Sequence, residues 1–182
     1  MEKRKLPVLA NLYKDVEEAA KNNELNILLN QPPKPEWVKQ NKYAGNTNYI
    51  PIEKVEYLLT SIYQKWRVEI KNLTVIANSV VITIRLHIQD PITGEWDWQD
   101  GVGAAPIQTE KGAAATDFTK VNTSAVQMAA PAAESYAIKD AAEKLGKIFG
   151  KDINRKDVID VLPTMFNKQD ALNEKLKQLT NV

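Results

Sequence analysis

One stretch of the 182-residue chain, SVVITIRLHIQD at 79–90, restricts the possible folds more than any other. Its large aliphatic residues recur at every second position, so they share one face of an extended strand. Such a face is stable only when a second layer of structure covers it, and the chain therefore needs a sheet with one buried side. The residues on this face are Val80, Ile82, Ile84, Leu86 and Ile88.

Two neighbouring stretches predict strands that pair with this one. In residues 66–76, WRVEIKNLTVI, apolar and charged side chains alternate. In residues 92–105, ITGEWDWQDGVGAA, Trp96 and Trp98 alternate with charged residues, and the overlapping DPITGE is typical of a turn. We expect an antiparallel β-meander of three strands, with both tryptophans in the core and a base-stacking role for them as the alternative.

Apolar residues at helical spacing predict the other elements. Pro51 is suited to the first turn of one helix, and Gly150 is suited to the end of another. Residues 103–124 have too weak a pattern for either element and are read as a long mobile loop. The predicted fold class is α+β, an antiparallel β-meander packed against helices, with an N-terminal helical arm and a C-terminal helix. The expected helices span residues 8–30, 51–66, 131–149 and 164–179.

Three segments are expected along the chain. The prolines of NQPPKPEW interrupt the first helical pattern, so residues 1–45 are read as an N-terminal helix followed by a proline-rich arm. Residues 46–155 form the α+β core, and residues 156–182 form a helical tail. The arm is predicted to pack on the core or on a neighbouring subunit, with a plain linker as the alternative.

Composition excludes several kinds of site. The chain has no cysteine, which excludes disulfides, thiol catalysis and cysteine zinc sites. His87 is the one histidine, so a histidine-based triad or a multi-histidine metal site is impossible. The GVG at 101–103 lacks both the later glycine of a dinucleotide-binding turn and a Walker lysine. We expect no cofactor and no enzymatic activity.

The location of the chain is also expected from its sequence. No apolar run approaches the roughly 20 residues of a membrane span. The first 20 residues, MEKRKLPVLANLYKDVEEAA, lack the apolar core of a signal peptide. We expect a cytoplasmic protein that does not contact membranes.

Acidic residues offer one catalytic alternative. Glu95 and Asp97 share a strand face in EWDWQD, and Asp100 follows them. Carboxylates in this arrangement could bind a divalent cation in a metal-dependent nuclease. The other interpretation is that these residues form the solvated face of an antiparallel strand. No nucleophile or further metal ligand stands at a spacing that would indicate a catalytic site.

Basic residues offer a different site. The net charge is +1, so a nucleic-acid surface must come from local clusters of lysine and arginine. Such clusters, with an aromatic ring beside them, suit a groove for a single strand, in which cations hold phosphates and rings stack on bases. A set of solvated charges is the alternative, because Asp140 and Glu143 are interleaved with the lysines. The candidate residues are Lys144, Lys147 and Lys151 on one expected helix, Arg67 and Arg85 on strands, and Lys54, Lys65 and Tyr63 on or beside the helix at 51–66.

Several motifs, in order, resemble the single-strand annealing proteins of the Rad fifty-two superfamily, in particular the phage recombinases. The resemblance covers residues 49–152. In that family a helix ending in an aromatic residue and Trp leads into a β-meander with a G-x-G strand end, and a helix ending in F-G closes the core. The motifs here are YLLTSIYQKWRVEI, VVITIRLHI, GEWDWQDGVGAA and AAESYAIKDAAEKLGKIFG.

The resemblance implies ATP-independent binding and annealing of single-stranded DNA in recombination and repair, by a ring-shaped or helical homo-oligomer. It implies that Lys144 and Lys147 are basic groove residues, that Tyr63 matches a family tyrosine, and that Lys54 approximates a basic position. Glu143 stands where the family has a basic residue. Possible partners are a phage exonuclease or a host single-strand-binding protein in the host cytoplasm. An oligomeric interaction module without DNA binding remains the alternative.

Overall fold

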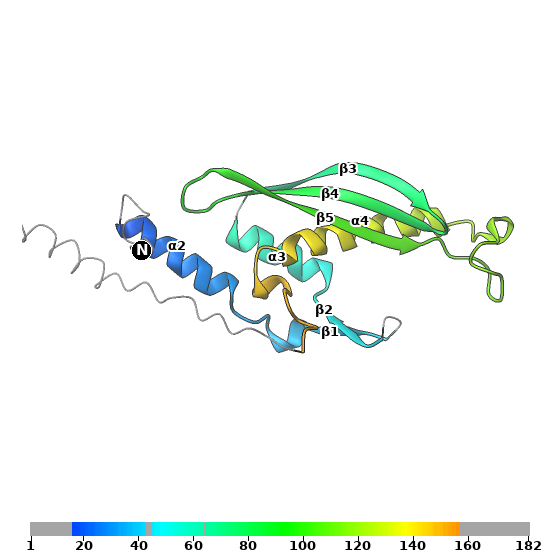
Figure 1. Cartoon of the computed structure of the whole chain (residues 1–182), viewed down its shortest axis with the longest axis horizontal. Helices are drawn as coiled ribbons and strands as arrows, with labels where there is room; N and C mark the ends of the chain where they lie inside the picture. The colour runs from blue at the N-terminus through cyan, green and yellow to red at the C-terminus, as the bar shows by residue number, and fades with distance from the viewer. Residues whose placement is uncertain (1–15, 43–44, 64, 157–182) are drawn as a thin grey trace, which may run out of the picture. The chain divides into compact units, whose positions relative to one another are not determined.

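The computed structural model describes residues 16–42, 45–63 and 65–156 (Figure 1). They belong to two units: residues 32–155 form one, and residues 16–31 with Lys156 belong to the other. The second unit contains helix α2, Val16–Leu29. The first part of the helix expected at 8–30 and the whole helix expected at 164–179 lie outside the described residues.

The larger unit contains the expected β-meander, which confirms the α+β class. Strands β3 (Trp66–Ile76), β4 (Ser79–Gln89) and β5 (Trp96–Pro106) pair antiparallel in the order β3-β4-β5. The register of β3 shifts between Ile70 and Asn72, so a bulge interrupts its alternation. The five aliphatic residues predicted to share a face of β4 are all buried.

Helix α4 (Ala125–Glu143) covers the inner face of β4 and β5 (Figure 1). Its buried face consists largely of alanines at every fourth position, which lets the helix lie very close to the sheet. A Cβ on Gly103 would lie only 2.0 Å from the Ala133 carbonyl oxygen, and one on Gly101 would lie 2.1 Å from that of Ala137. The GVG segment therefore serves helix packing.

A shorter helix and a two-stranded hairpin also belong to this unit. Helix α3 (Ile52–Ile62) begins after Pro51, as expected, and buries Val55, Leu58 and Leu59. The turn η1 (Pro35–Trp37) leads into a hairpin of β1 (Lys39–Asn41) and β2 (Thr47–Tyr49). This hairpin belongs to the same unit as the sheet, whereas the sequence interpretation extended the arm to residue 45.

The boundaries around α4 differ from those expected. The helix was predicted at 131–149 but spans Ala125–Glu143, with Pro131 inside it. The chain then forms η3 (Lys147–Phe149), which ends at Gly150 with φ of +102°, a conformation that favours glycine. Of the expected loop at 103–124, residues up to Pro106 belong to β5, and η2 (Phe118–Lys120) lies near its end.

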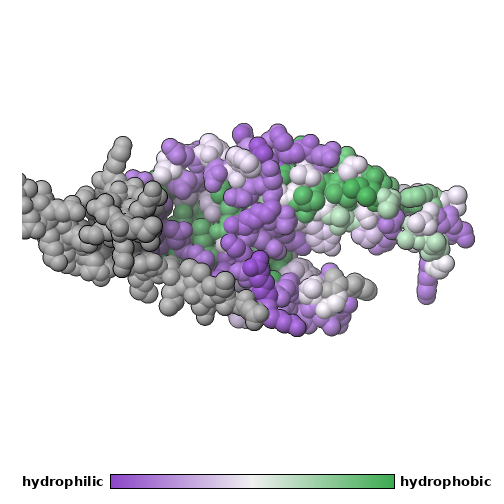
Figure 2. Space-filling view, in the orientation of Figure 1, coloured by the Kyte–Doolittle hydropathy of each residue, from purple (hydrophilic) through white to green (hydrophobic). Residues whose placement is uncertain are grey.

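The inner face of β3 remains largely uncovered. Ile70, Leu73 and Val75 are 53–54% exposed, although their partners on β4 are buried. Strands lie about 4.8 Å apart, so a three-stranded sheet is wider than one helix can cover. Figure 2 shows hydrophobic side chains gathered over the end of the sheet where β3 finishes. Among the described helices, none has the length and apolar character needed to cross a membrane.

Candidate nucleic-acid interface

The outer face of the sheet carries charged and aromatic side chains at one end. The register places Arg67, His87 and Trp98 in one row across the three strands. The next row contains Glu69, Arg85 and Asp100. The rows toward the β3–β4 turn carry uncharged residues, so the charged surface is confined to one half of this face.

Trp96 and Trp98 belong to this outer face, and their predicted place in the core was wrong. They are 49% and 47% exposed. Gly101 and Gly103 face α4, and strand alternation then turns residues 96 and 98 to the other side.

Each of these two tryptophans contacts an arginine. The Arg67 guanidinium lies 5.2 Å from the centroid of the Trp96 ring, and that of Arg85 lies 3.7 Å from the centroid of Trp98. These are cation–π distances. The tryptophans are two residues apart on β5; Arg85 lies on the adjacent strand β4, whereas Arg67 reaches its ring from β3, on the other side of β4.

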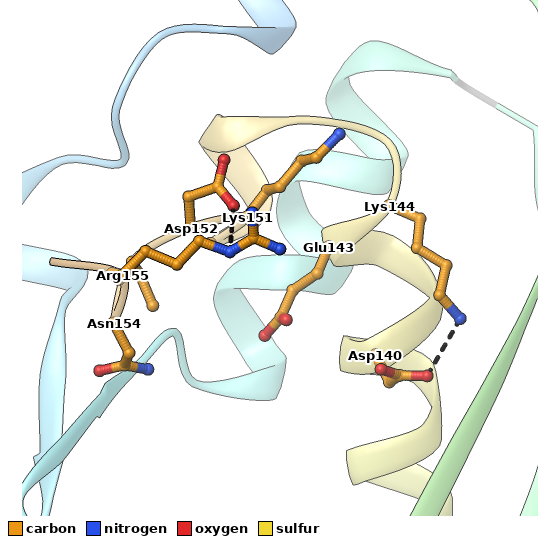
Figure 3. Close-up of a pocket in the computed structure, with 9 residues that line it drawn as sticks. Asp140, Glu143, Lys144, Lys151, Asp152, Asn154 and Arg155 are labelled. Atoms are coloured by element: carbon orange, nitrogen blue, oxygen red, sulfur yellow. Dashed lines mark hydrogen bonds and ion pairs between the residues drawn. The ribbon is translucent and has the colours of Figure 1, made fainter. Parts of the chain in front are cut away.

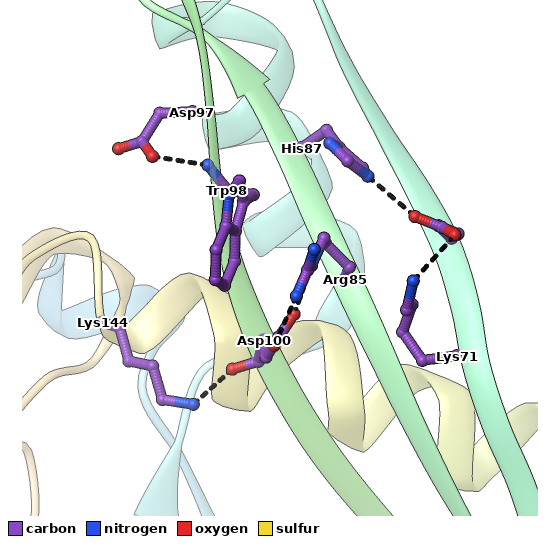
Figure 4. A network of polar contacts seen from close by, with 8 residues as sticks. Lys71, Arg85, His87, Asp97, Trp98, Asp100 and Lys144 are labelled. Carbon is purple, nitrogen blue, oxygen red and sulfur yellow. Dashed lines mark hydrogen bonds and ion pairs between the residues drawn. The ribbon is translucent and has the colours of Figure 1, made fainter.

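Ion pairs hold most of the other charges in this half of the face (Figure 4). Arg85 donates from Nε and Nη2 to the two carboxylate oxygens of Asp100, at 2.8 and 3.0 Å, which lowers the pKa of that carboxyl group. The Glu69 carboxylate lies 3.1 Å from both His87 Nε2 and Lys71 Nζ, and its pKa is lowered by these contacts. Within the described residues, Arg67 forms no ion pair.

Lys144 connects this face to the end of helix α4. It is the residue at which the helix ends, a position that favours a cation because the last carbonyls carry partial negative charge. Its Nζ donates to the Asp100 main-chain oxygen (Figure 4) and, at 3.1 Å, to Asp140 Oδ2 (Figure 3). Asp100 thus contacts Arg85 through its side chain and Lys144 through its main chain, which brings together two predicted cations far apart in sequence.

Beyond Lys144, a pocket of about 380 Å³ lies at the C-terminal end of α4 (Figure 3). Lys144, Lys151 and Arg155 line it, and Asp140, Glu143 and Asp152 line it too. Arg155 pairs with Asp152 at 2.9 Å. Burial raises the pKa of Glu143, with the nearby Asp140 carboxylate adding to the effect. The pocket is therefore of mixed charge, as the interleaved acids had suggested.

A second pocket, of about 410 Å³, shares Asp140 and Glu143 with the first. Here the Lys139 ammonium lies 5.1 Å from the ring centroid of Tyr49 and 4.5 Å from that of Tyr136. Burial lowers the pKa of Lys139. This cluster was not predicted from the sequence, although Tyr136 and Lys139 stand at helical i, i+3 spacing.

The remaining candidate residues are dispersed. Lys147 lies on η3 and not on α4, so the three lysines do not form one stripe along a helix. Lys54 lies 5.8 Å from the ring centroid of Trp37, in another cluster, and Lys65 is exposed just before β3. Tyr63 is only 5% exposed, which leaves no ring face for a base, and burial raises its pKa to about 12.

The acidic residues of EWDWQD do not converge. Asp97 accepts a hydrogen bond from the Trp98 main-chain nitrogen at 2.7 Å, whereas Asp100 is held by Arg85 on the outer face. No group of three potential metal-binding side chains exists among the residues that the structure describes. The nuclease alternative therefore gains no support from their arrangement.

Comparison with protein-family models gives no match, and comparison with curated proteins gives none either. The resemblance to annealing proteins thus remains a prediction that rests on the order of the sequence motifs.

Proposed function

We propose that the protein binds single-stranded DNA and anneals complementary strands in recombination and repair, as a homo-oligomer and without a nucleotide cofactor. The observation that carries this proposal is the chain of contacts around Asp100. It joins the arginine and tryptophan side chains of the sheet to Lys144 and, through the shared pocket, to Lys151 and Arg155. Cations beside exposed rings are the two components of a surface for single strands.

The cations would act by exchanging partners. Lys144 now donates to Asp140, and both side chains are about half exposed, so a phosphate competes with the carboxylate at little cost. Each phosphate neutralised in this way releases condensed counterions. Reduced charge on the first strand weakens its repulsion of a second strand. Base stacking, about 1.4 kcal/mol per step, then drives pairing without ATP.

The salt dependence of binding tests this proposal. In Lys144→Ala/Lys151→Ala, the slope of log K against log salt for an oligo(dT) strand should flatten by about 1.4 per subunit site, since each contact contributes about 0.7. The loss of affinity should be similar for other base sequences, because phosphate contacts do not read bases. A strand-annealing assay on the same variant should show a parallel loss.

A matched control is available on the loop after β5. Lys111 and Lys120 are exposed, and Lys111 follows the end of that strand by five residues, at the opposite end of the sheet from the tryptophans. Lys111→Ala/Lys120→Ala removes the same charge and should leave the slope nearly unchanged. Equal slopes for wild type and the Lys144/Lys151 variant, with both folded, would contradict the proposal.

Self-association has its own support in the uncovered apolar residues of β3. A strand at the edge of a sheet with an exposed apolar face tends to be paired or covered. The same feature favours the second candidate function, an oligomeric interaction module that binds no DNA. A protein that associates with itself but binds no single strand at low salt would support that candidate instead.

Such a protein would act in the cytoplasm, in a host cell if a phage encodes it. A phage exonuclease that produces single strands, or a host single-strand-binding protein that covers them, would be a suitable partner.

A further inference from the structure

Two large aromatic side chains on an exposed sheet face require an explanation of their own. Trp96 and Trp98 are each about half exposed, and both lie on the outer face of β5, away from the helix that covers the sheet. Each ring contacts an arginine guanidinium, which favours its present position before any ligand arrives. Exposed aromatic rings are what stacking on a base requires.

The spacing of the two rings also fits a nucleic-acid strand. Residues two apart in a strand are separated by about 6.8 Å along the chain. Stacked bases rise by about 3.4 Å each, so this separation corresponds to two base steps. Trp96 and Trp98 thus match the separation of every second base in an unpaired, partly stacked strand.

The two arginines have different contacts, which suggests different roles. Arg85 is held by both carboxylate oxygens of Asp100, so its charge is already neutralised and it supports the Trp98 ring. Arg67 contacts Trp96 and forms no ion pair among the described residues. Its charge is thus available to a phosphate beside a base that stacks on Trp96.

We infer that the outer face of the sheet is a base-stacking platform, on which Trp96 and Trp98 bind unpaired bases of a single strand. The inference rests on the proposed DNA binding and adds to it, because the lysines around Lys144 would hold phosphates while these rings hold bases. The competing interpretation is that the Arg–Trp pairs only stiffen the sheet.

The test compares a normal strand with one that lacks bases. Oligo(dT) and an abasic oligonucleotide of equal length and charge are titrated at one salt concentration. Wild type should prefer oligo(dT). Trp96→Leu/Trp98→Leu removes both rings and should lose about 25-fold or more in affinity for oligo(dT), from the lower end of the range for two stacked bases, and keep its affinity for the abasic strand. Trp98→Phe, which keeps an aromatic ring, should lose less than Trp98→Leu.

Controls separate the platform from general effects. Val102→Leu changes an exposed residue on the same face of β5 and should leave both affinities unchanged. The melting temperature of every variant shows whether the sheet survives. If the double variant fails to fold, Trp98→Phe and Trp98→Leu alone decide the matter by their affinities for the two strands.

The outcomes distinguish the two proposals. If wild type binds oligo(dT) and the folded tryptophan variants keep their preference for it over the abasic strand, the platform is wrong while DNA binding stands. If wild type binds neither strand at low salt, both proposals fail.

A separate measurement tests the role of Arg67. In Arg67→Gln, the slope of log K against log salt for oligo(dT) should flatten by about 0.7, because one phosphate contact is lost.

Discussion

At the scale of single residues, Gly101 and Gly103 determine which side of β5 meets the helix. Because α4 lies almost against the strand, only a residue without a Cβ fits at these two positions. Alternation along the strand then places Trp96 and Trp98 on the outer face. Two residues without side chains therefore decide where the largest side chains of the strand lie.

The first prediction concerns this close approach. Gly103→Ala should lower the free energy of unfolding by about 1–3 kcal/mol or more, because the new methyl group would overlap the backbone of α4, which cannot move independently. Chemical denaturation measures the loss. Ala104→Ser is the matched control, since it adds one atom at the neighbouring exposed position and should change stability by less than about 0.5 kcal/mol. Equal stability of both variants would mean that the helix does not lie so close.

A second prediction follows from the buried hydroxyl of Tyr63. Burial, with smaller contributions from Asp90 and Asp97, raises its pKa from 10.0 to about 12. Below pH 10 the hydroxyl is protonated in both the folded and the unfolded chain. Between pH 10 and 12 only the unfolded chain ionises, so the folded state loses up to about 2–3 kcal/mol of stability there.

Tyr63→Phe keeps the ring and removes this ionisation. Unfolding followed by circular dichroism should show that the variant loses less stability than wild type as the pH rises from 10 to 12, while other tyrosines contribute equally to both proteins. Parallel pH profiles for the two proteins would contradict the assigned burial.

At the scale of elements, those with a strong apolar pattern were predicted, and the bounds of those with a weak pattern were missed. The alternation of apolar residues in β4 was enough to predict a sheet with one buried side, since its five aliphatic residues all lie on the same face. The end of β5 and the start of α4 escaped prediction because glycine and alanine give little apolar contrast. The lysines were placed on one helix because the periodicity seemed to continue past Glu143, where the helix in fact ends. Of the predicted site, only Arg67, Arg85, Lys144 and Lys151 form a connected surface.

The third prediction concerns the segment after α4. Phe149 is 1% exposed, so Phe149→Ala should lower the free energy of unfolding by about 3–5 kcal/mol. Leu145, four residues earlier, is only partly covered, so Leu145→Ala should cost clearly less. Denaturant titration of both variants ranks them. The reverse ranking would show that η3 packs differently.

At the scale of the whole molecule, the sheet is covered on one side by a helix that is too narrow for it. Ile70, Leu73 and Val75 extend the apolar layer of β4 outward without anything over them in the larger unit. A second copy is the occupant that the proposed assembly provides, because every subunit carries the same unsatisfied edge.

The fourth prediction tests that contact. Leu73→Thr/Val75→Thr introduces threonine, a β-branched residue that suits a strand, at both positions and so removes apolar surface. Light scattering should show smaller particles for this variant than for wild type. Val102→Thr, an equally exposed change on the opposite face, should leave particle size unchanged. A wild-type chain that stays at the 20.5 kDa monomer mass at micromolar concentration would contradict the prediction.

Asp100 gives the proposed binding surface a reversible character. Its carboxylate binds Arg85, and its main-chain oxygen binds Lys144, so the protein itself contains a substitute for a phosphate. A DNA strand that binds Lys144 gains only the difference in free energy between the contact with its phosphate and the contact with the Asp100 oxygen. Such an exchange keeps each contact weak and short-lived, and an annealing protein needs this property, because it must let go of the finished duplex.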